Sequence, residues 1–196
     1  AGGRRSPGFA SPSAIARRGI VRTFQRTSVF PALSVEDNVL TGMHLRGTAG
    51  FLEVLAGRRR LAVEENGLGT EAAVILAFVG LAHRRREAAS ALPYGEQRLV
   101  ELAVALAARP QVLLLDEPGA GMTGVEKTVV SGLIRKIREQ GVTVLLVEHD
   151  MRMVMGISDT VIALNGGRVI AEGPPAAIQS HPDVIRAYLG ASSGAA

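Results

Sequence analysis

The chain has 196 residues, of which 47% are hydrophobic and 4% aromatic, and its formal net charge is +4. This length and composition allow one or at most two small globular domains with an aliphatic core. The absence of cysteine excludes a disulfide scaffold and a Cys-ligated zinc site, and no apolar run reaches the roughly 20 residues that a membrane-spanning helix needs.

Basic residues outnumber acidic ones by 22 to 18 and gather in two arginine triplets, residues 58–60 and 84–86. No aromatic residues alternate with these arginines, so a stacking platform for single-stranded nucleic acid is not supported. We expect a solvated basic surface and no nucleic-acid partner. Residues 1–12 hold no hydrophobic segment of the signal-peptide type, and there is no initiator Met. We therefore expect a piece that starts inside a longer protein.

Three zones follow one another along the chain. Residues 1–33 predict short extended pieces and turns, residues 34–108 are rich in helix signals, and residues 109–196 alternate strand and helix signals. The helical zone opens with Ser34 and, three residues later, Asp37. This spacing predicts a helix start, because the two side chains can satisfy amide groups that have no partner within the helix.

Further helices are predicted in the middle zone. Residues 42–57 are interrupted by glycine and predict loops and a broken helix, whereas residues 71–80 predict a short buried helix that a glycine ends. Residues 94–108 carry an apolar stripe at helical spacing that stops before a proline. The members of that stripe are Leu99, Leu102, Ala103 and Leu106.

The pattern then changes to continuous apolar runs at residues 112–115 and 142–147. Such runs predict parallel strands that are covered on both faces. Residues 125–140, between them, predict an amphipathic helix, and this strand-helix-strand order gives the α/β class. Residues 161–171, with Asn165-Gly166 at the turn, predict a β-hairpin.

Titratable side chains follow both predicted parallel strands. Asp116 and Glu117 come after one strand, and His149 follows the other. Ligand sites in open α/β sheets lie outside the carboxyl ends of the strands, so we expect these three side chains at one crevice. Paired acids suit phosphoryl chemistry, because one can hold Mg²⁺ through its water shell while the other orients an attacking water. A strand exit followed by a solvated turn is an equally open interpretation.

Two weaker signals complete the set. Gly95 lies at the start of the predicted helix 94–108, where a glycine lets an anion approach the backbone amides. Gln25 follows a short apolar run at residues 19–21. Each alone is typical of an ordinary helix cap or a surface glutamine. Their order and spacing relative to the acidic pair and His149 make them informative.

In that order these residues resemble the ABC transporter ATPase family, from about Gly19 to Leu189. The segments that carry the resemblance are residues 22–25 (RTFQ) for the Q-loop, 92–97 (LPYGEQ) for a variant signature motif, 112–116 for Walker B, 121–124 for the D-loop and 148–150 for the switch-histidine segment. The chain resembles the ATPases of branched-chain amino acid importers in particular. The segments that carry this closer resemblance are RTFQ, LPYGEQ, VEHDM and VIRAYLG.

The resemblance implies an α/β fold with a P-loop-NTPase-like core and a helical subdomain. Residues 1–33 and 109–196 would belong to the core, and residues 34–108 to the helical subdomain. ATP and Mg²⁺ are the implied cofactors. Glu117 would polarise the attacking water and His149 would contact the γ-phosphate. The residues implied to bind the nucleotide are Gln25, Pro93, Tyr94, Gly95, Glu96, Gln97 and Asp116, with Gln25 and Asp116 also holding Mg²⁺.

The same resemblance implies partners and a location. Two ATPase subunits, identical or different, would close head to tail around ATP and drive separate transmembrane permease subunits. A periplasmic or extracellular substrate-binding protein would take part indirectly. The ATPase would be cytoplasmic and peripheral on the inner face of the cell membrane. The segment from about Ser34 to Ala91, with Gln25 at its entrance, would dock the permease. Apolar residues in and near it, such as Phe30, Phe51 and Leu52, would fill a groove on the permease or simply pack the subdomain.

Several positions depart from the family pattern. No G-x-x-x-x-G-K-[ST] loop occurs in the chain, and residues 124–128 only imitate one, because two residues separate glycine from lysine and the segment follows Walker B. We expect the N-terminal strands and the phosphate loop to be missing and the chain alone to be inactive. Thr123 and Gly124 stand where asparagine and proline are common, and Val104 where arginine is.

Two other functions stay open from the sequence. The first is a soluble ABC-type ATPase that acts on nucleic acid or ribosomes, which the basic charge would suit. Such proteins usually carry two cassettes or long coiled insertions, and the sequence has neither. The second is a non-enzymatic remnant that only binds its former partners.

Overall fold

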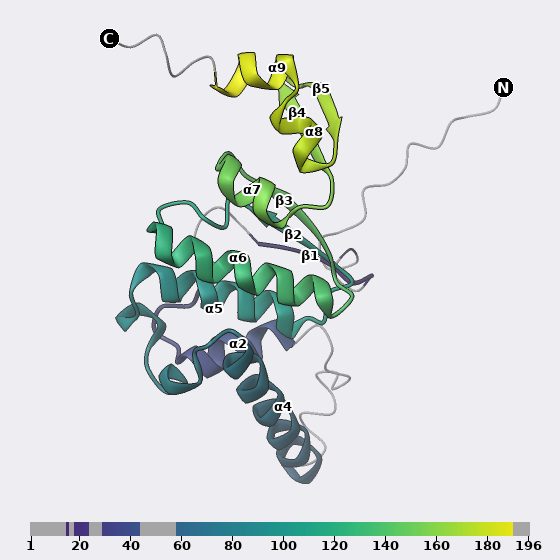
Figure 1. Cartoon of the computed structure of the whole chain (residues 1–196). Helices are drawn as coiled ribbons and strands as arrows, with labels where there is room; N and C mark the ends of the chain where they lie inside the picture. The colour runs from purple at the N-terminus through teal and green to yellow at the C-terminus, as the bar shows by residue number, and fades with distance from the viewer. Residues whose placement is uncertain (1–14, 16–17, 24–28, 44–57, 190–196) are drawn as a thin grey trace, which may run out of the picture. The chain divides into compact units, whose positions relative to one another are not determined.

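The computed structural model describes residue 15 and residues 18–23, 29–43 and 58–189 (Figure 1). Two compact units are formed, and each is described by itself. The first unit comprises residues 1–118 and 137–147, and the second comprises residues 119–136 and 148–196. The three-zone division stays a prediction. No helix among the described residues combines the length and the apolar character needed to cross a bilayer.

The helices of the first unit begin with α2 (Val35–Met43), where the predicted helix start is confirmed. The Ser34 hydroxyl accepts from the Asp37 amide at 3.0 Å and donates to the Asp37 carboxylate at 2.6 Å. Two short 3₁₀ turns, η1 (Ala82–Arg84) and η2 (Ala89–Ala91), precede α5. The prediction at Tyr94 is also confirmed, because α5 spans Tyr94–Ala107.

The helix predicted over residues 71–80 is longer than the sequence suggested. It is the second half of α4 (Arg58–Phe78). Gly67 and Gly69 lie inside the helix and obscured its first half, since glycine weakens helices by about 1 kcal/mol relative to alanine. Gly80, with φ of 83°, follows the helix as predicted. Most of the loop region predicted at residues 42–57 lies outside the described residues.

The sheet of the first unit is parallel, with the strand order β1 (Ile20–Arg22), β2 (Val112–Asp116), β3 (Thr143–Val147). The register pairs Arg22 with Leu114 and Asp116 with Val147. Parallel order was predicted for the two later strands and is confirmed. As a result, the carboxyl ends of all three strands lie at one edge of the sheet.

The prediction that β3 is covered on both faces is wrong. Leu145 is 56% exposed and Val147 is 57% exposed, and exposure alternates along the strand. Successive side chains of a strand point to opposite faces, so one whole face of β3 is open to solvent within the described residues. Apolar runs do not distinguish this arrangement from a fully covered strand.

The second unit contains α6 from its start at Gly124, together with a hairpin and short helices. Helix α6 spans Gly124–Glu139 and is the predicted amphipathic helix. The other elements are α7 (Met151–Ile157), β4 (Val161–Asn165), β5 (Arg168–Gly173), α8 (Pro175–Gln179), α9 (Pro182–Val184) and η3 (Ile185–Leu189). Their small core consists of Ala163, Ala171, Ile178 and Val184.

The hairpin prediction is confirmed, but its turn lies one residue later than expected. Asn165 is the last residue of β4, and the turn is formed by Gly166 and Gly167, with φ of 54° and 78°. Both central residues need positive φ in a tight hairpin turn, and glycine adopts it without steric cost.

Candidate functional site

The end of β2 carries the first part of the site. Asp116 is the last residue of β2, and its Oδ2 accepts from Nη2 of Arg22, the last residue of β1, at 2.8 Å. The parallel register places the two side chains side by side at the strand ends. The carboxylate of Asp116 is 21% exposed and the Arg22 side chain 57%, so the pair is open to a ligand.

Glu117 has an unusual backbone conformation. Its φ of 47° lies in the left-handed region, which costs a non-glycine residue of order 1 kcal/mol. Its amide donates to the carbonyl of Val147 at 2.8 Å. This bond ties Glu117 to the end of β3, so the strand ends of the first unit fix the position of the acid that follows β2.

The structure can test the predicted metal ligands only in part. Gln25 lies outside the described residues, so its predicted contacts with nucleotide and Mg²⁺ stay predictions. Among the described residues there is no group of three or more acidic or histidine side chains that could hold a metal ion. A lone carboxylate such as Asp116 fits Mg²⁺ that keeps most of its ligands as water and phosphate oxygens, which is the usual arrangement for this ion.

The start of α5 carries the second part of the site. Pro93 is the N-cap residue, and no side chain caps this helix start. Gly95 is buried and Tyr94 is 43% exposed. The Gln97 side chain donates back to the carbonyl of Leu92 at 2.9 Å. Uncapped amides at a helix start form a site that favours an anion.

Glu96 of the same segment turns toward the protein. Its Oε2 forms an ion pair with Arg84, 3.1 Å from Nε, and Nη1 of the same arginine donates to Glu87 Oε1 at 3.1 Å. The neighbouring Arg85 donates to Glu36. Two members of the arginine triplet 84–86 are thus paired with carboxylates, so this triplet does not form an unneutralised basic patch.

A pair inside α5 was missed by the sequence analysis. Arg98 and Glu101 are paired at 2.8 Å with side chains only 8% and 7% exposed. Arg98 Nε also donates to the hydroxyl of Tyr94 at 3.0 Å, and its guanidinium lies 5.3 Å from the centre of that ring. The only signal in the sequence was a charged pair three residues apart within an apolar stripe.

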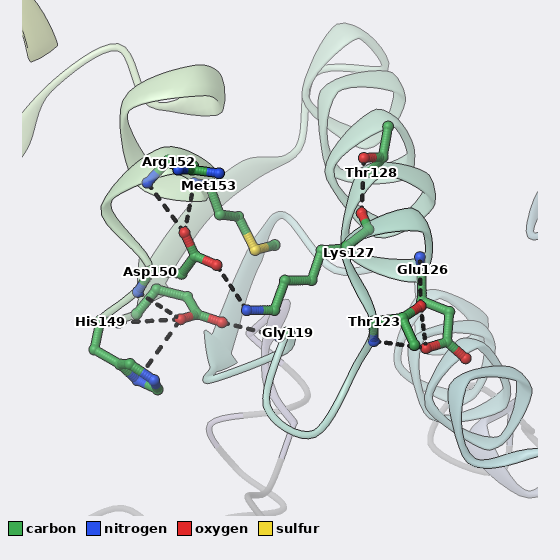
Figure 2. A network of polar contacts seen from close by, with 11 residues as sticks. Gly119, Thr123, Glu126, Lys127, Thr128, His149, Asp150, Arg152 and Met153 are labelled. Carbon is green, nitrogen blue, oxygen red and sulfur yellow. Dashed lines mark hydrogen bonds and ion pairs between the residues drawn. The ribbon is translucent and has the colours of Figure 1, made fainter.

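The loops of the second unit carry the third part of the site. His149 is the switch-histidine candidate, and its side chain is 70% exposed, whereas that of Glu148 is 1% exposed. His149 Nδ1 lies 3.9 Å from Glu148 Oε2. Glu148 also accepts from the amide of Gly119 at 2.9 Å. Figure 2 shows His149 and Gly119 in this network.

Lys127 is the lysine of the segment that imitates a phosphate-binding loop. Its ammonium donates to Asp150 Oδ2 at 2.6 Å (Figure 2). This hydrogen bond raises the pKa of Lys127 and lowers the pKa of Asp150. Asp150 also caps α7, because its Oδ1 accepts from the amides of Arg152 and Met153. Lys127 therefore has a carboxylate partner within its own unit.

The D-loop candidate ends in a helix cap. The amide and the hydroxyl of Thr123 both donate to Glu126 at 2.8 Å, and the Glu126 amide donates to the Thr123 hydroxyl at 3.3 Å (Figure 2). The hydrogen bond from the Thr123 amide lowers the pKa of Glu126. Thr123 thus acts here as an N-cap residue, a role that asparagine also fills well.

The structure therefore brings some of the predicted residues together within each unit. Asp116 and Glu117 lie at the strand ends of the first unit, whereas His149 lies with Gly119 in the second. Their convergence at one crevice stays a prediction. Sequence analysis missed the partners of these residues, such as Arg22 and Glu148, although both lie inside segments that it singled out.

Comparison with known proteins shows which family the chain resembles. A family model described as ABC transporter matches residues 6–120, and one described as branched-chain amino acid ATP-binding cassette transporter matches residues 168–193. BraF of Pseudomonas aeruginosa, a high-affinity branched-chain amino acid transport ATP-binding protein, is 41% identical over 177 residues, which is 90% of this chain and 69% of that protein. LivG of Escherichia coli, which carries the same description, is 40% identical with the same coverage.

Solved structures agree with this result. The ADP conformation of MJ1267, an ATP-binding cassette of an ABC transporter, matches with a TM-score of 0.74 and 26% identity, over 91% of this chain and 71% of that one. A nucleotide-free cassette from an ABC transporter matches with a TM-score of 0.71 and 27% identity, over 90% and 71%. The predicted α/β class is confirmed, and with motifs, sequence and fold in agreement, the chain belongs to the ABC transporter ATP-binding family.

Proposed function

We propose that this chain is the ATP-hydrolysing subunit of an importer for branched-chain amino acids. The adjacent carboxylates of Asp116 and Glu117 at the end of a parallel strand carry the proposal for the chemistry. The match of residues 168–193 to the branched-chain amino acid family, together with the two relatives, supports the substrate class.

Each part of the site has a role in this proposal. Asp116 would hold Mg²⁺, and the ion would supply positive charge to neutralise the phosphates. Glu117 orients and deprotonates the attacking water. His149 contacts the γ-phosphate, and Gln25 senses the nucleotide. The amides at the start of α5, around Gly95, meet the γ-phosphate that a second subunit holds.

The 196-residue chain by itself binds MgATP weakly in this proposal and does not turn it over. It contains no glycine-rich loop with a lysine to neutralise the β- and γ-phosphates. Lys127 does not replace that lysine, because its ammonium is already paired with Asp150. Titration calorimetry of this chain with MgATP tests the point, and a low-micromolar dissociation constant would contradict it.

The proposed partners are a second ATPase subunit, two permease subunits in the membrane and, through them, a substrate-binding protein outside the inner membrane. The protein then lies on the cytoplasmic face of that membrane. The segment from about Ser34 to Ala91, together with the residues at its entrance, is proposed as the docking surface. Its supporting observation is Phe30, which is 55% exposed just before α2. Phe51 and Leu52, the other predicted contacts, lie outside the described residues.

Substitution of Glu117 tests the proposed chemistry. In a transporter assembled with the upstream phosphate-binding loop restored, Glu117→Gln is expected to retain ATP binding and to lower turnover by about 10²–10⁴-fold, because an amide keeps the shape but cannot act as a base. Uptake of labelled leucine into vesicles should fall in parallel. Turnover within about twofold of the parent would mean that Glu117 is not the catalytic acid. Turnover that leucine and its binding protein do not stimulate would contradict the substrate class.

Substitution of Phe30 tests the docking surface. In a protein with the phosphate-binding loop restored, Phe30→Asp is expected to prevent assembly with the permease, because a charge desolvated in an apolar groove is costly. The soluble subunit with that loop restored is expected to keep its basal ATPase activity. Co-purification with the permease and ATPase assays measure the two properties. Loss of folding together with both properties would mean that Phe30 serves packing instead.

A further inference from the structure

Glu148 is buried beside a histidine that is exposed. The Glu148 side chain is 1% exposed, while the next residue, His149, is 70% exposed. Burying a carboxylate is costly unless hydrogen bonds or ion pairs satisfy its oxygens. The contacts of this carboxylate therefore indicate what it does.

Both oxygens of Glu148 accept from backbone amides. Oε1 accepts from Gly119 at 2.9 Å, and Oε2 accepts from His149 at 3.0 Å and from Asp150 at 3.2 Å. These amides belong to two loops, one that follows β2 and one that follows β3. A single carboxylate thus joins Gly119, just before the D-loop candidate at residues 121–124, to the backbone of the switch histidine.

The loop at Gly119 lies very close to this carboxylate. A Cβ atom at Gly119 would lie 2.9 Å from Glu148 Oε1, 3.2 Å from Met153 Sδ and 3.5 Å from Lys127 Cγ. The backbone of the loop therefore packs directly against Glu148 and against α7. Movement of one loop must displace the carboxylate that holds the other.

A second connection lies beside the first. Lys127, in the first turns of α6, donates to Asp150, and Asp150 caps α7 immediately after His149 (Figure 2). The backbone of His149 is thus held from both sides. On one side are the hydrogen bonds that the amides of His149 and Asp150 donate to Glu148, and on the other is the cap of α7. The His149 side chain is 70% exposed.

We propose that Glu148 is a positioning residue that couples the loop beginning at Gly119 to His149, so that the two segments respond to nucleotide as one piece. The inference rests on the proposed function, in which His149 contacts the γ-phosphate. Glu148 acts through the backbone amides of its neighbours, with the His149 imidazole Nδ1 3.9 Å from its Oε2, and need not touch the nucleotide.

Hydrogen exchange at single amides tests the coupling in the 196-residue chain. Glu148→Gln keeps the shape but cannot accept at both ends, and Glu148→Ala removes every acceptor. The amides of Gly119, His149 and Asp150 are expected to exchange about tenfold faster or more in both variants, because bonds to a charged acceptor are lost. Glu172→Gln on β5 is the matched control, since it removes an exposed carboxylate of the same unit.

Two outcomes would overturn the positioning role. In the first, the three amides exchange as in the parent chain. In the second, exchange rises equally at Ala163 and Ala171 in the hairpin, which would mean that Glu148 only stabilises the unit as a whole. Glu148→Gln guards against loss of folding, because it changes neither the size of the side chain nor its burial.

Kinetics of the assembled transporter give an independent readout. Glu148→Gln is expected to lower kcat about ten- to hundredfold, because a misplaced catalytic group slows the step without weakening ground-state binding. KM for ATP should stay within about twofold. A ten- to hundredfold rise in the KM for ATP with unchanged kcat would overturn the positioning role of Glu148. A parent transporter that hydrolyses no ATP even with the phosphate-binding loop restored would overturn the proposed function, and the exchange result would still report on the coupling.

Discussion

At the contact between α2 and α5, backbone approaches backbone, whereas in the loops after β2 and β3 a buried carboxylate and an ion pair join the segments. A Cβ at Gly42 would collide with the carbonyl oxygen of Val104 and lie 3.0 Å from the Cβ of Ala107. At Gly119, the nearest atom to such a Cβ is the end of the Glu148 side chain. The first contact cannot adjust without moving a helix, and the second can adjust by rotating a side chain.

This difference indicates how each region tolerates change. In tight helix packing, any added side-chain volume pushes on the backbone. Even one added methylene in a protein interior can lower its stability. A hydrogen-bonded loop responds instead to loss of charge or of an acceptor. The helical contact therefore sets stability, while the loop network sets the position of functional groups.

The largest effect on stability is expected for Gly42→Ala. The added methyl meets a carbonyl oxygen of a buried helix, so we expect the free energy of unfolding to fall by about 3 kcal/mol, at the upper end of overpacking effects. Thermal melting should report a decrease of about 6–12 °C for a chain of this size.

Gly132→Ala is the matched control for this prediction. Gly132 also lies in a helix, α6, but a Cβ there meets nothing within 4 Å. Alanine should raise the free energy of unfolding by about 0.5–1 kcal/mol, because it favours the helix more than glycine does. Equal effects of the two substitutions would contradict the close approach of α2 and α5.

The next effect is expected for Asn38→Ala. Asn38 is fully buried; it accepts from the amide of Phe30 at 2.8 Å and donates to the carbonyls of Phe30 at 3.1 Å and Ser34 at 2.9 Å. Its loss leaves buried polar groups unsatisfied, so we expect a cost of about 2 kcal/mol by denaturant unfolding.

An exposed asparagine gives the comparison for Asn38. Asn165→Ala at the end of β4 should change stability by no more than about 0.5 kcal/mol, as surface substitutions generally do. If Asn38→Ala were as mild, the segment from Phe30 to Ser34 would not depend on this side chain, and the docking surface proposed at Phe30 would lack its support.

The smallest effect is expected for Lys127→Met, and it should depend on pH. The hydrogen bond with Lys127 lowers the pKa of Asp150 below its ordinary value of 3.8. A carboxyl group with a lowered pKa stabilises the fold above its unfolded pKa, and this contribution is lost as the pH falls through the folded value. The parent chain should therefore melt higher than Lys127→Met at pH 7.

Melting curves at several pH values check this prediction. The difference between the parent and Lys127→Met should shrink as the pH falls below about 4 and the Asp150 carboxylate takes up a proton. A difference that does not change between pH 7 and pH 3 would mean that the methylenes of Lys127 stabilise the loop, and not its charge.

Much of the architecture could be predicted because its signals are local. A hydroxyl three residues before an acid predicted the start of α2, an apolar stripe predicted α5, and the glycines at 166 and 167 accompany the predicted hairpin. The prediction failed where the signal depends on what lies opposite. The apolar run of β3 does not reveal that Leu145 and Val147 are exposed, because covered and open faces use the same residue types.

For the candidate site, the sequence by itself determined which residues are the candidates for the chemistry and in what order they come. Asp116 ends a strand and Glu117 and His149 follow strands, and these positions depend only on local pattern. Tertiary structure alone decided their partners: Arg22 lies beside Asp116 because two parallel strands pair in a particular register, although the residues are 94 apart in the chain. Glu148 likewise accepts a hydrogen bond from the amide of Gly119, although the two residues are 29 apart in the chain. Contacts over such separations depend on how the elements pack, and no local pattern of residues encodes them.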